Sequence, residues 1–255
     1  MTPNELSRRQ FLRKSGSVAA GLAAAHVLAQ NAGVSTAQAA AASGNEICRM
    51  DAVSLARAIR SKQLSPIEVI DAVLVRMDKL EPTLHAFCTP TPEVARETAK
   101  RIEADIMAGR AVGPLAGVPI GIKDLVYTKG IKTTSGSIVY KDYVPTEDDV
   151  VVERLKAAGA VILGKTNVPE FGMGSHTYNS VYGTTVNPYD VTKSAGGSSG
   201  GAGAALAAGL LPLADGSDLG GSLRNPANFN NIVALRPTSG ISPALGDETS
   251  LGLHV

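Results

Sequence analysis

The chain has 255 residues, a formal net charge of +1, and 44% hydrophobic and 18% charged residues. Such a composition excludes disorder and is sufficient for one sizeable buried core. The balanced charge, without a dense stripe of Lys and Arg interleaved with aromatic residues, argues against nucleic acid as a partner.

The first 39 residues are typical of an export signal. Two adjacent arginines lie in Ser7–Lys14 (SRRQFLRK), a weakly apolar Ala/Gly run continues to about Gln30, and Ala37–Ala39 supplies small residues for cleavage. The apolar run is too short and too mild for a stable membrane span. We therefore expect a signal peptide over 1–39, read by the twin-arginine export machinery, and a periplasmic or secreted mature chain over 40–255. A basic, disordered tail is the alternative.

Cysteine and histidine are too sparse for a metal site. The two cysteines, Cys48 and Cys88, and four scattered histidines have no zinc-type ligand spacing, so we predict no metal and no cofactor. A protein exported after folding exposes its thiols to an oxidising compartment only late. Two buried thiols are therefore favoured over a disulfide, which needs the two Cα atoms within bonding range.

Residues 50–110 are predicted to be helical. One helix begins at Asp51, and a second begins at Ser65–Glu68 (SPIE), which combines an N-cap serine, a proline at the first helical position and a capping-box glutamate. A third begins at Thr91 and ends before Gly109. Nothing in this segment indicates catalysis.

The pattern from Val112 onward predicts an α/β sheet, because short apolar runs alternate with Gly-rich or helical segments. The expected strands are 117–122, 160–163 and 210–214, and the expected helices are 146–158 and 201–208.

Gly159–Thr166 (GAVILGKT) fits the phosphate-binding pattern G-x-x-x-x-G-K-T. A phosphate loop needs free backbone amides between its glycines, whereas here the intervening residues form the predicted strand. Gly159 is better explained as the end of the preceding helix. Nucleotide binding is therefore disfavoured.

Gly197–Gly201 (GSSGG) also fits the nucleophile-elbow pattern G-x-S-x-G of α/β-hydrolases, with Ser199 as nucleophile. That fold needs an acid and then a histidine later in the chain, and only Asp247 and His254, near the end, are available. This interpretation remains the alternative. A flexible Gly/Ser linker is excluded, because the glycines continue directly into the apolar helix Ala202–Ala208.

Three chemically capable side chains converge in this topology. One helix and one strand separate Ser198 from Ser222, so the loops that hold them return to the same edge of the sheet. Lys123 follows the strand 117–122 and reaches that edge if the strands are parallel. Desolvation there would lower its pKa by about 3 units, as a lysine base needs near neutrality. A structural ion pair with Asp124 is the alternative role for Lys123.

Three segments, in this order, resemble the amidase signature family: Gly117–Asp124 (GVPIGIKD), Gly196–Gly201 (GGSSGG) and Gly216–Ala227 (GSDLGGSLRNPA). The resemblance extends from about Met50 to Pro243. Members include bacterial amide hydrolases, fatty acid amide hydrolase and the glutamine-hydrolysing subunit of tRNA-dependent amidotransferases. It implies an α/β amidase signature fold, a mixed β-sheet core covered by helices.

The resemblance also implies the role of each residue. Ser222 would be the nucleophile, Ser198, after a cis Gly197–Ser198 bond, the bridging serine, and Lys123 the base. The implied oxyanion hole is formed by the N–H groups of Leu219, Gly220, Gly221 and Ser222. The implied supporting residues are Ser199, Ser217, Asp218 and Arg224.

The resemblance predicts an amidase that acts on a small-molecule linear, peptide or cyclic amide through an acyl-enzyme. The export signal disfavours the amidotransferase role, since charged tRNA is cytoplasmic. Family members are substantially longer, so we expect the C-terminal part of the domain to be missing from residues 40–255. A catalytically inactive, truncated remnant is therefore a further alternative, and formation of a homo-oligomer is left open.

Overall fold

The computed structural model describes residues 44–238 and residue 241, which belong to the unit Ala42–Val255. The predicted signal peptide, Asp247 and His254 lie outside the described residues. The helices are α2 (Gly44–Ile47), α3 (Ala52–Arg60), α4 (Pro66–Leu84), α5 (Pro92–Met107), α6 (Val150–Ala157), α7 (Gly200–Ala207) and α8 (Arg224–Phe229), with short 3-10 turns at Ile138–Tyr140 and Glu170–Gly172. The strands are β1 (Phe87–Pro90), β2 (Pro119–Lys123), β3 (Val161–Thr166), β4 (Tyr178–Asn179), β5 (Gly183–Thr184), β6 (Val186–Asn187), β7 (Asp190–Ser194) and β8 (Leu213–Ala214).

The central sheet has the strand order β1-β3-β2-β8. β2 is parallel to both β3 and β8, whereas β1 is antiparallel to β3. β4 with β5 and β6 with β7 form two separate antiparallel pairs. The sheet is therefore mixed, as predicted, and its two parallel pairings bring the carboxyl ends of β2, β3 and β8 to one edge.

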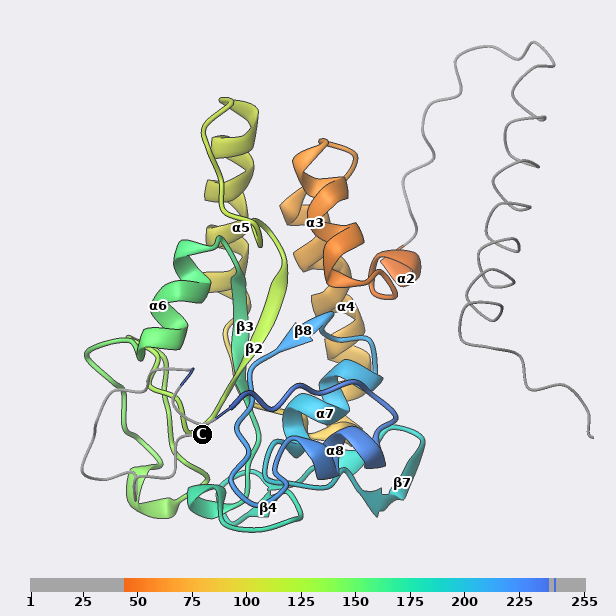
Figure 1. Cartoon of the computed structure of the whole chain (residues 1–255), viewed down its shortest axis with the longest axis vertical. Helices are drawn as coiled ribbons and strands as arrows, with labels where there is room; N and C mark the ends of the chain where they lie inside the picture. The colour runs from red at the N-terminus through yellow and green to blue at the C-terminus, as the bar shows by residue number, and fades with distance from the viewer. Residues whose placement is uncertain (1–43, 239–240, 242–255) are drawn as a thin grey trace, which may run out of the picture. The chain divides into compact units, whose positions relative to one another are not determined.

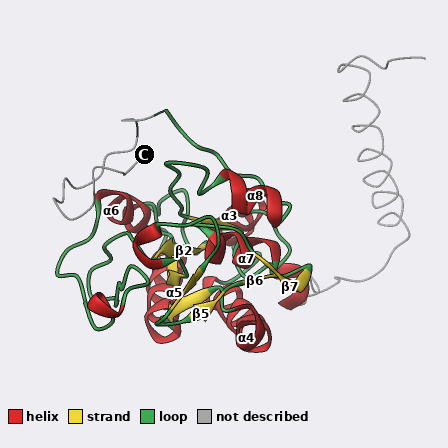
Figure 2. Cartoon of the chain, turned by 90° about the horizontal axis from the view of Figure 1, so that it is seen from below, coloured by secondary structure: helices red, strands yellow, loops and turns green. Residues whose placement is uncertain are grey.

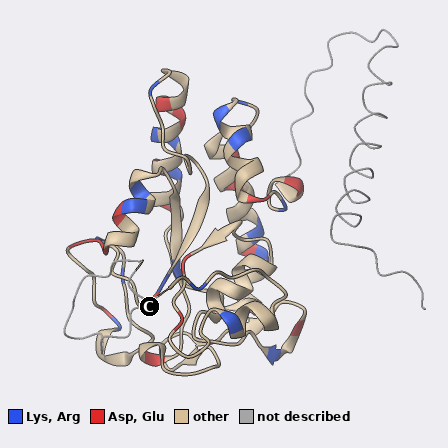
Figure 3. Cartoon of the chain, in the orientation of Figure 1, with Lys and Arg blue, Asp and Glu red and all other residues tan. Residues whose placement is uncertain are grey.

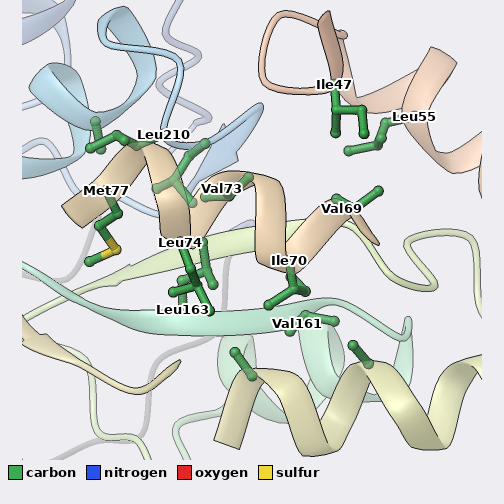
Figure 4. Close-up of a cluster of buried hydrophobic side chains, with 14 of the residues drawn as sticks. Ile47, Leu55, Val69, Ile70, Val73, Leu74, Met77, Val161, Leu163 and Leu210 are labelled. Atoms are coloured by element: carbon green, nitrogen blue, oxygen red, sulfur yellow. The ribbon is translucent and has the colours of Figure 1, made fainter. Parts of the chain in front are cut away.

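α4 covers one face of the sheet, and its start is the predicted capping box. The Ser65 hydroxyl accepts from the N–H of Ile67 at 3.0 Å, and the Ser65 N–H donates to Glu68 Oε2 at 2.9 Å. In Figure 4, Ile70 and Leu74 of α4 point toward β3, where Val161 and Leu163 belong to the same buried cluster. Helical periodicity thus places one apolar face of α4 against the strand.

α6 covers the opposite face. Its Val152 is fully buried and packs with Ile120 and Ile122 of β2 and with Ile162 of β3. Side chains alternate along β3, so Ile162 faces α6 while its neighbours Val161 and Leu163 face α4. Figures 1 and 2 show the strands between α4 and α6, which gives a helix–sheet–helix arrangement.

Two expected boundaries were wrong. β1 interrupts the stretch predicted to be wholly helical, because Phe87–Pro90 adds an antiparallel edge strand to β3. α6 begins at Val150, after the start predicted at Thr146, because the Asp149 carboxylate caps the helix by accepting from the N–H of Val151. β3 extends through Thr166, so the residues between Gly159 and Lys165 are strand, as the argument against a phosphate loop requires.

Charged side chains of both signs are interspersed along the outer helices in Figure 3, rather than gathered by sign. Within the described range, no helix is both long enough and apolar enough to cross a bilayer. Cys48 and Cys88 are both unpaired; Cys88 is buried, whereas Cys48 is only partly buried.

Candidate active site

The end of β2 meets the loop after β8 at one edge of the sheet. Ile120 and Gly121 pair with Leu213 and Ala214 of the parallel strand β8. The ladder continues as the Asp215 N–H donates to the Gly121 carbonyl at 3.0 Å. Asp215 in turn accepts the N–H of Lys123 on Oδ2 at 3.1 Å. These bonds fix the backbone of Lys123 against the Gly-rich loop.

Lys123 lies entirely inside the protein, with 0% of its surface exposed. Its Nζ lies 2.8 Å from Ser198 Oγ, 2.9 Å from Ser217 Oγ and 3.4 Å from the Ser217 carbonyl oxygen. Burial lowers the pKa of Lys123 to about 7, against the opposing attraction of Asp215 and Asp218. A large fraction of Lys123 is thus a neutral amine near neutral pH.

The alternative role of Lys123, an ion pair with Asp124, is not observed. The Asp124 carboxylate instead accepts from the Thr134 hydroxyl at 2.6 Å and from the N–H of Thr134 at 3.1 Å. Adjacent residues of a strand point to opposite faces, which separates the two side chains. The Lys123 side chain is therefore left to the serines.

The opening of α7 places Ser198 beside Lys123. The Gly197–Ser198 peptide bond is cis, and a Cβ on Gly197 would lie 2.8 Å from the backbone nitrogen of His176. Only glycine therefore fits between Ser198 and the segment that passes behind it. The described structure thus brings the expected base and bridging serine into direct contact.

Ser222 lies next to this pair without contacting Lys123. Its carbonyl accepts the N–H of Ser199 at 3.1 Å, which ties the two serine-containing loops together. Its Oγ has no hydrogen-bond partner among the described residues. Ser199, which is 2% exposed, accepts from the N–H of Ser217 and donates to the Ser217 carbonyl, both at 3.3 Å. Ser199 thus holds the loop that contains Ser217.

Asp218 organises the loop that contains Ser222. Its fully buried carboxylate accepts from the N–H of Gly221 at 2.8 Å and from Arg224 Nη2 at 2.9 Å. Its other oxygen accepts from the N–H groups of Leu223 and Arg224. The Arg224 guanidinium is the main reason why the pKa of Asp218 lies well below its usual range. Asp218 and Arg224 therefore stabilise the loop, as expected.

These bonds narrow the set of expected oxyanion donors. The N–H of Gly221 already has an acceptor in Asp218. Within residues 44–238, the N–H groups of Leu219, Gly220 and Ser222 have no protein acceptor. Leu219 is 53% exposed, so this part of the loop faces solvent and is open to a ligand.

A second buried lysine, Lys165, was not singled out from the sequence as a site residue. Its Nζ donates to the Val126 carbonyl and to Thr128 Oγ1, the latter at 2.9 Å. Burial lowers its pKa to about 8, opposed chiefly by Asp124. Asp215 was also missed. Both residues lie at or just beyond a strand end, a position that could have marked them.

A mixed α/β fold with a buried Lys–Ser pair at the strand ends is a feature shared with known enzymes. The family described as Amidase matches residues 68–248. The chain therefore belongs to the amidase signature family.

A subunit of the glutamyl-tRNA(Gln) amidotransferase of Cyanothece sp. (strain PCC 7425 / ATCC 29141) is 48% identical over 186 residues, 73% of this chain and 39% of the relative. A bacterial aryl acylamidase of the same family superposes with a TM-score of 0.67 at 37% identity, covering 70% of this chain and 37% of that one. Peptide amidase from Stenotrophomonas maltophilia gives 0.68 at 33% identity, covering 71% and 39%. This chain thus spans about two fifths of the length of these relatives.

Proposed function

We propose that this protein is an exported amidase that hydrolyses a small-molecule linear, peptide or cyclic amide through an acyl-enzyme on Ser222. The observation that carries the proposal is the 2.8 Å contact between the buried Lys123 Nζ and Ser198 Oγ, beside the loop that holds Ser222. A neutral buried lysine can remove a proton, and the serine beside it can relay that proton.

The proposed reaction proceeds in two halves. Ser222 Oγ attacks the amide carbonyl carbon while its proton moves to Ser198, whose own proton moves to Lys123 Nζ. The N–H groups of Leu219, Gly220 and Ser222 would then donate to the developing oxyanion. The proton returns through Ser198 to the leaving nitrogen as the C–N bond breaks. Water then hydrolyses the ester on Ser222 and releases the carboxylic acid.

This sequence requires a change at Ser222, because its Oγ makes no hydrogen bond with the described residues. Rotation about one side-chain bond, rather than movement of the loop, would direct the hydroxyl toward Ser198. The loop itself is already held by Asp218 and by the bond from Ser199 to the Ser222 carbonyl. Such contacts commonly tighten only when substrate binds.

The substrate class rests on the relatives. An aryl acylamidase and a peptide amidase share the fold, so an amide with a small acyl or amine part fits the proposal. The amidotransferase relatives would favour glutamine, but the predicted export signal favours an extracytoplasmic amide.

Serine-directed labelling tests the proposal. The purified chain is treated with a fluorophosphonate and its intact mass is measured beside that of Ser222→Ala and Ser199→Ala. We expect one adduct that Ser222→Ala loses and Ser199→Ala retains at a reduced rate. No adduct on a folded, soluble chain would overturn the proposal in favour of an inactive remnant.

The same experiment distinguishes the α/β-hydrolase alternative. That mechanism predicts that Ser199→Ala abolishes labelling and Ser222→Ala does not. The contacts of Ser199 argue against it, since this buried hydroxyl already donates to one backbone group of Ser217 and accepts from the other.

A further inference from the structure

Lys123 Nζ has three polar neighbours, and two of them belong to one residue. Ser217 offers its hydroxyl at 2.9 Å and its carbonyl oxygen at 3.4 Å, whereas Ser198 offers its hydroxyl at 2.8 Å. A carbonyl oxygen can only accept a hydrogen bond. The Ser217 carbonyl therefore fixes the direction of one N–H of Lys123.

A neutral amine has two N–H groups and one lone pair, so its three neighbours cannot be equivalent. To receive a proton from Ser198, the lone pair must point at Ser198 Oγ. Both N–H groups must then be accepted elsewhere, and only Ser217 provides two acceptors within range. The geometry of a single residue thus decides where the lone pair points.

We propose that Ser217 is a positioning residue that accepts both N–H groups of neutral Lys123 and thereby aims its lone pair at Ser198. This inference rests on the proposed function, because it assigns Ser217 a role in the same proton relay. Ser217 itself contacts neither Ser198 nor Ser222 through a hydrogen bond among the described residues. It therefore acts through Lys123 rather than on the substrate.

Ser199 gives this arrangement its rigidity. Its hydroxyl donates to the carbonyl of Ser217 and accepts the N–H of the same residue. The backbone group that receives Lys123 is thus itself held by a buried side chain. The second serine of the pair is connected to the base through Ser217, which explains a supporting role without a chemical step.

The charges that face Lys123 are Asp215, whose Oδ2 accepts its backbone N–H, and Asp218 in the loop. Asp215 also feels Lys165 and Asp149. None of these charges is altered by exchanging the Ser217 hydroxyl for hydrogen. An effect of Ser217→Ala on the ionisation of Lys123 would therefore report on the hydrogen bond alone.

The test compares Ser217→Ala with Ser217→Thr, which keeps the hydroxyl, in the full chain. Lysine labelled with carbon-13 at Cε reports the titration of Lys123 by NMR, with its signal assigned by Lys123→Met. The ammonium form donates to the Ser217 hydroxyl, so removing this acceptor should lower the pKa of Lys123 by about one unit. Ser217→Thr should leave the titration near that of the wild type.

The rate of fluorophosphonate labelling at pH 9 provides the second readout, since Lys123 is then neutral in all variants. We expect Ser217→Ala to be slowed at least about tenfold and Ser217→Thr less than about threefold. An unchanged titration, or an unchanged rate at pH 9, in Ser217→Ala would overturn the inference. Failure of the wild type to label would instead overturn the proposed function, and the NMR titration would then decide the role of Ser217.

Discussion

Lys123 connects the chemistry of the site to the stability of the protein. Burial lowers its pKa to about 7, whereas a lysine in an unfolded chain has a pKa near 10.4. Between these two values the unfolded state binds more protons than the folded state, so the free energy of unfolding rises with pH. The penalty for burying this lysine is therefore greatest below pH 7 and disappears as the pH approaches the unfolded value.

A measurable difference follows for Lys123→Met. Between pH 7 and pH 9, Lys123 should add about 2 kcal/mol to the free energy of unfolding of the wild type, and the variant should lack this gain. Urea-induced unfolding at the two pH values measures it. Lys100→Met, at an exposed position of α5, serves as the control and should retain the wild-type pH dependence. Equal gains in the wild type and in Lys123→Met would show that the lysine is not held neutral.

Individual residues also show where prediction from sequence succeeds and where it ends. Lys123, Ser198 and Ser222 were predictable because each lies in a contiguous segment with a defined place after a strand or before a helix. Asp215 was not, since a lone acid in a loop gives no sign that it will accept the N–H of Lys123. The engagement of the Gly221 N–H by Asp218 depends on how the loop curls back, which residue types do not specify.

At the level of elements, the helix α7 must approach the sheet very closely to place Ser198 beside Lys123. A Cβ on Gly201 would collide with the backbone of Asn167, just after β3, and with the carbonyl oxygen of Ala86, just before β1. Neither backbone can move without disturbing the pairing of β1 with β3. The glycines of this stretch are thus explained by packing of a helix against strand ends.

We therefore expect Gly201→Ala to destabilise the protein by about 3 kcal/mol, because overpacking of backbone cannot be relieved by a side-chain rotation. Gly220→Ala is the matched control for stability, since a Cβ there meets nothing within 4 Å. Urea-induced unfolding of both variants checks the difference. A loss in Gly201→Ala no larger than that in Gly220→Ala would contradict the close approach of α7.

The accuracy of element prediction follows from length and local chemistry. α4 was well predicted because a capping box and several turns of apolar periodicity agree. β1 was missed because four residues carry too little periodicity, and the strand forms only by pairing with the distant β3. For the same reason, the two-residue strands β4, β5 and β6 have no signal of their own, and β8 is shorter than the apolar run 210–214 suggests.

At the scale of the whole molecule, the sheet edge that holds the site is formed by segments distant in sequence. β2, the start of α7 and the loop after β8 meet because β2 is parallel to β8 and α7 lies between them along the chain. The parallel arrangement explains why three separated segments, rather than one motif, indicate the family. It also explains why the site could be inferred from topology before any distance was known.

Export is the prediction that concerns the whole chain. The paired arginines in Ser7–Lys14 predict recognition by the twin-arginine machinery, which reads a specific signal rather than charge alone. The full chain produced in a bacterium that has this machinery should reach the periplasm and begin at Ala40, as intact mass and N-terminal sequencing would show. The double variant Arg8→Lys with Arg9→Lys keeps the charge and should remain uncleaved in the cytoplasm, because Arg and Lys are not interchangeable at a specific recognition site. Arg13→Lys is the control outside the pair and should still be exported. Equal export of all three proteins would instead indicate a merely basic tail.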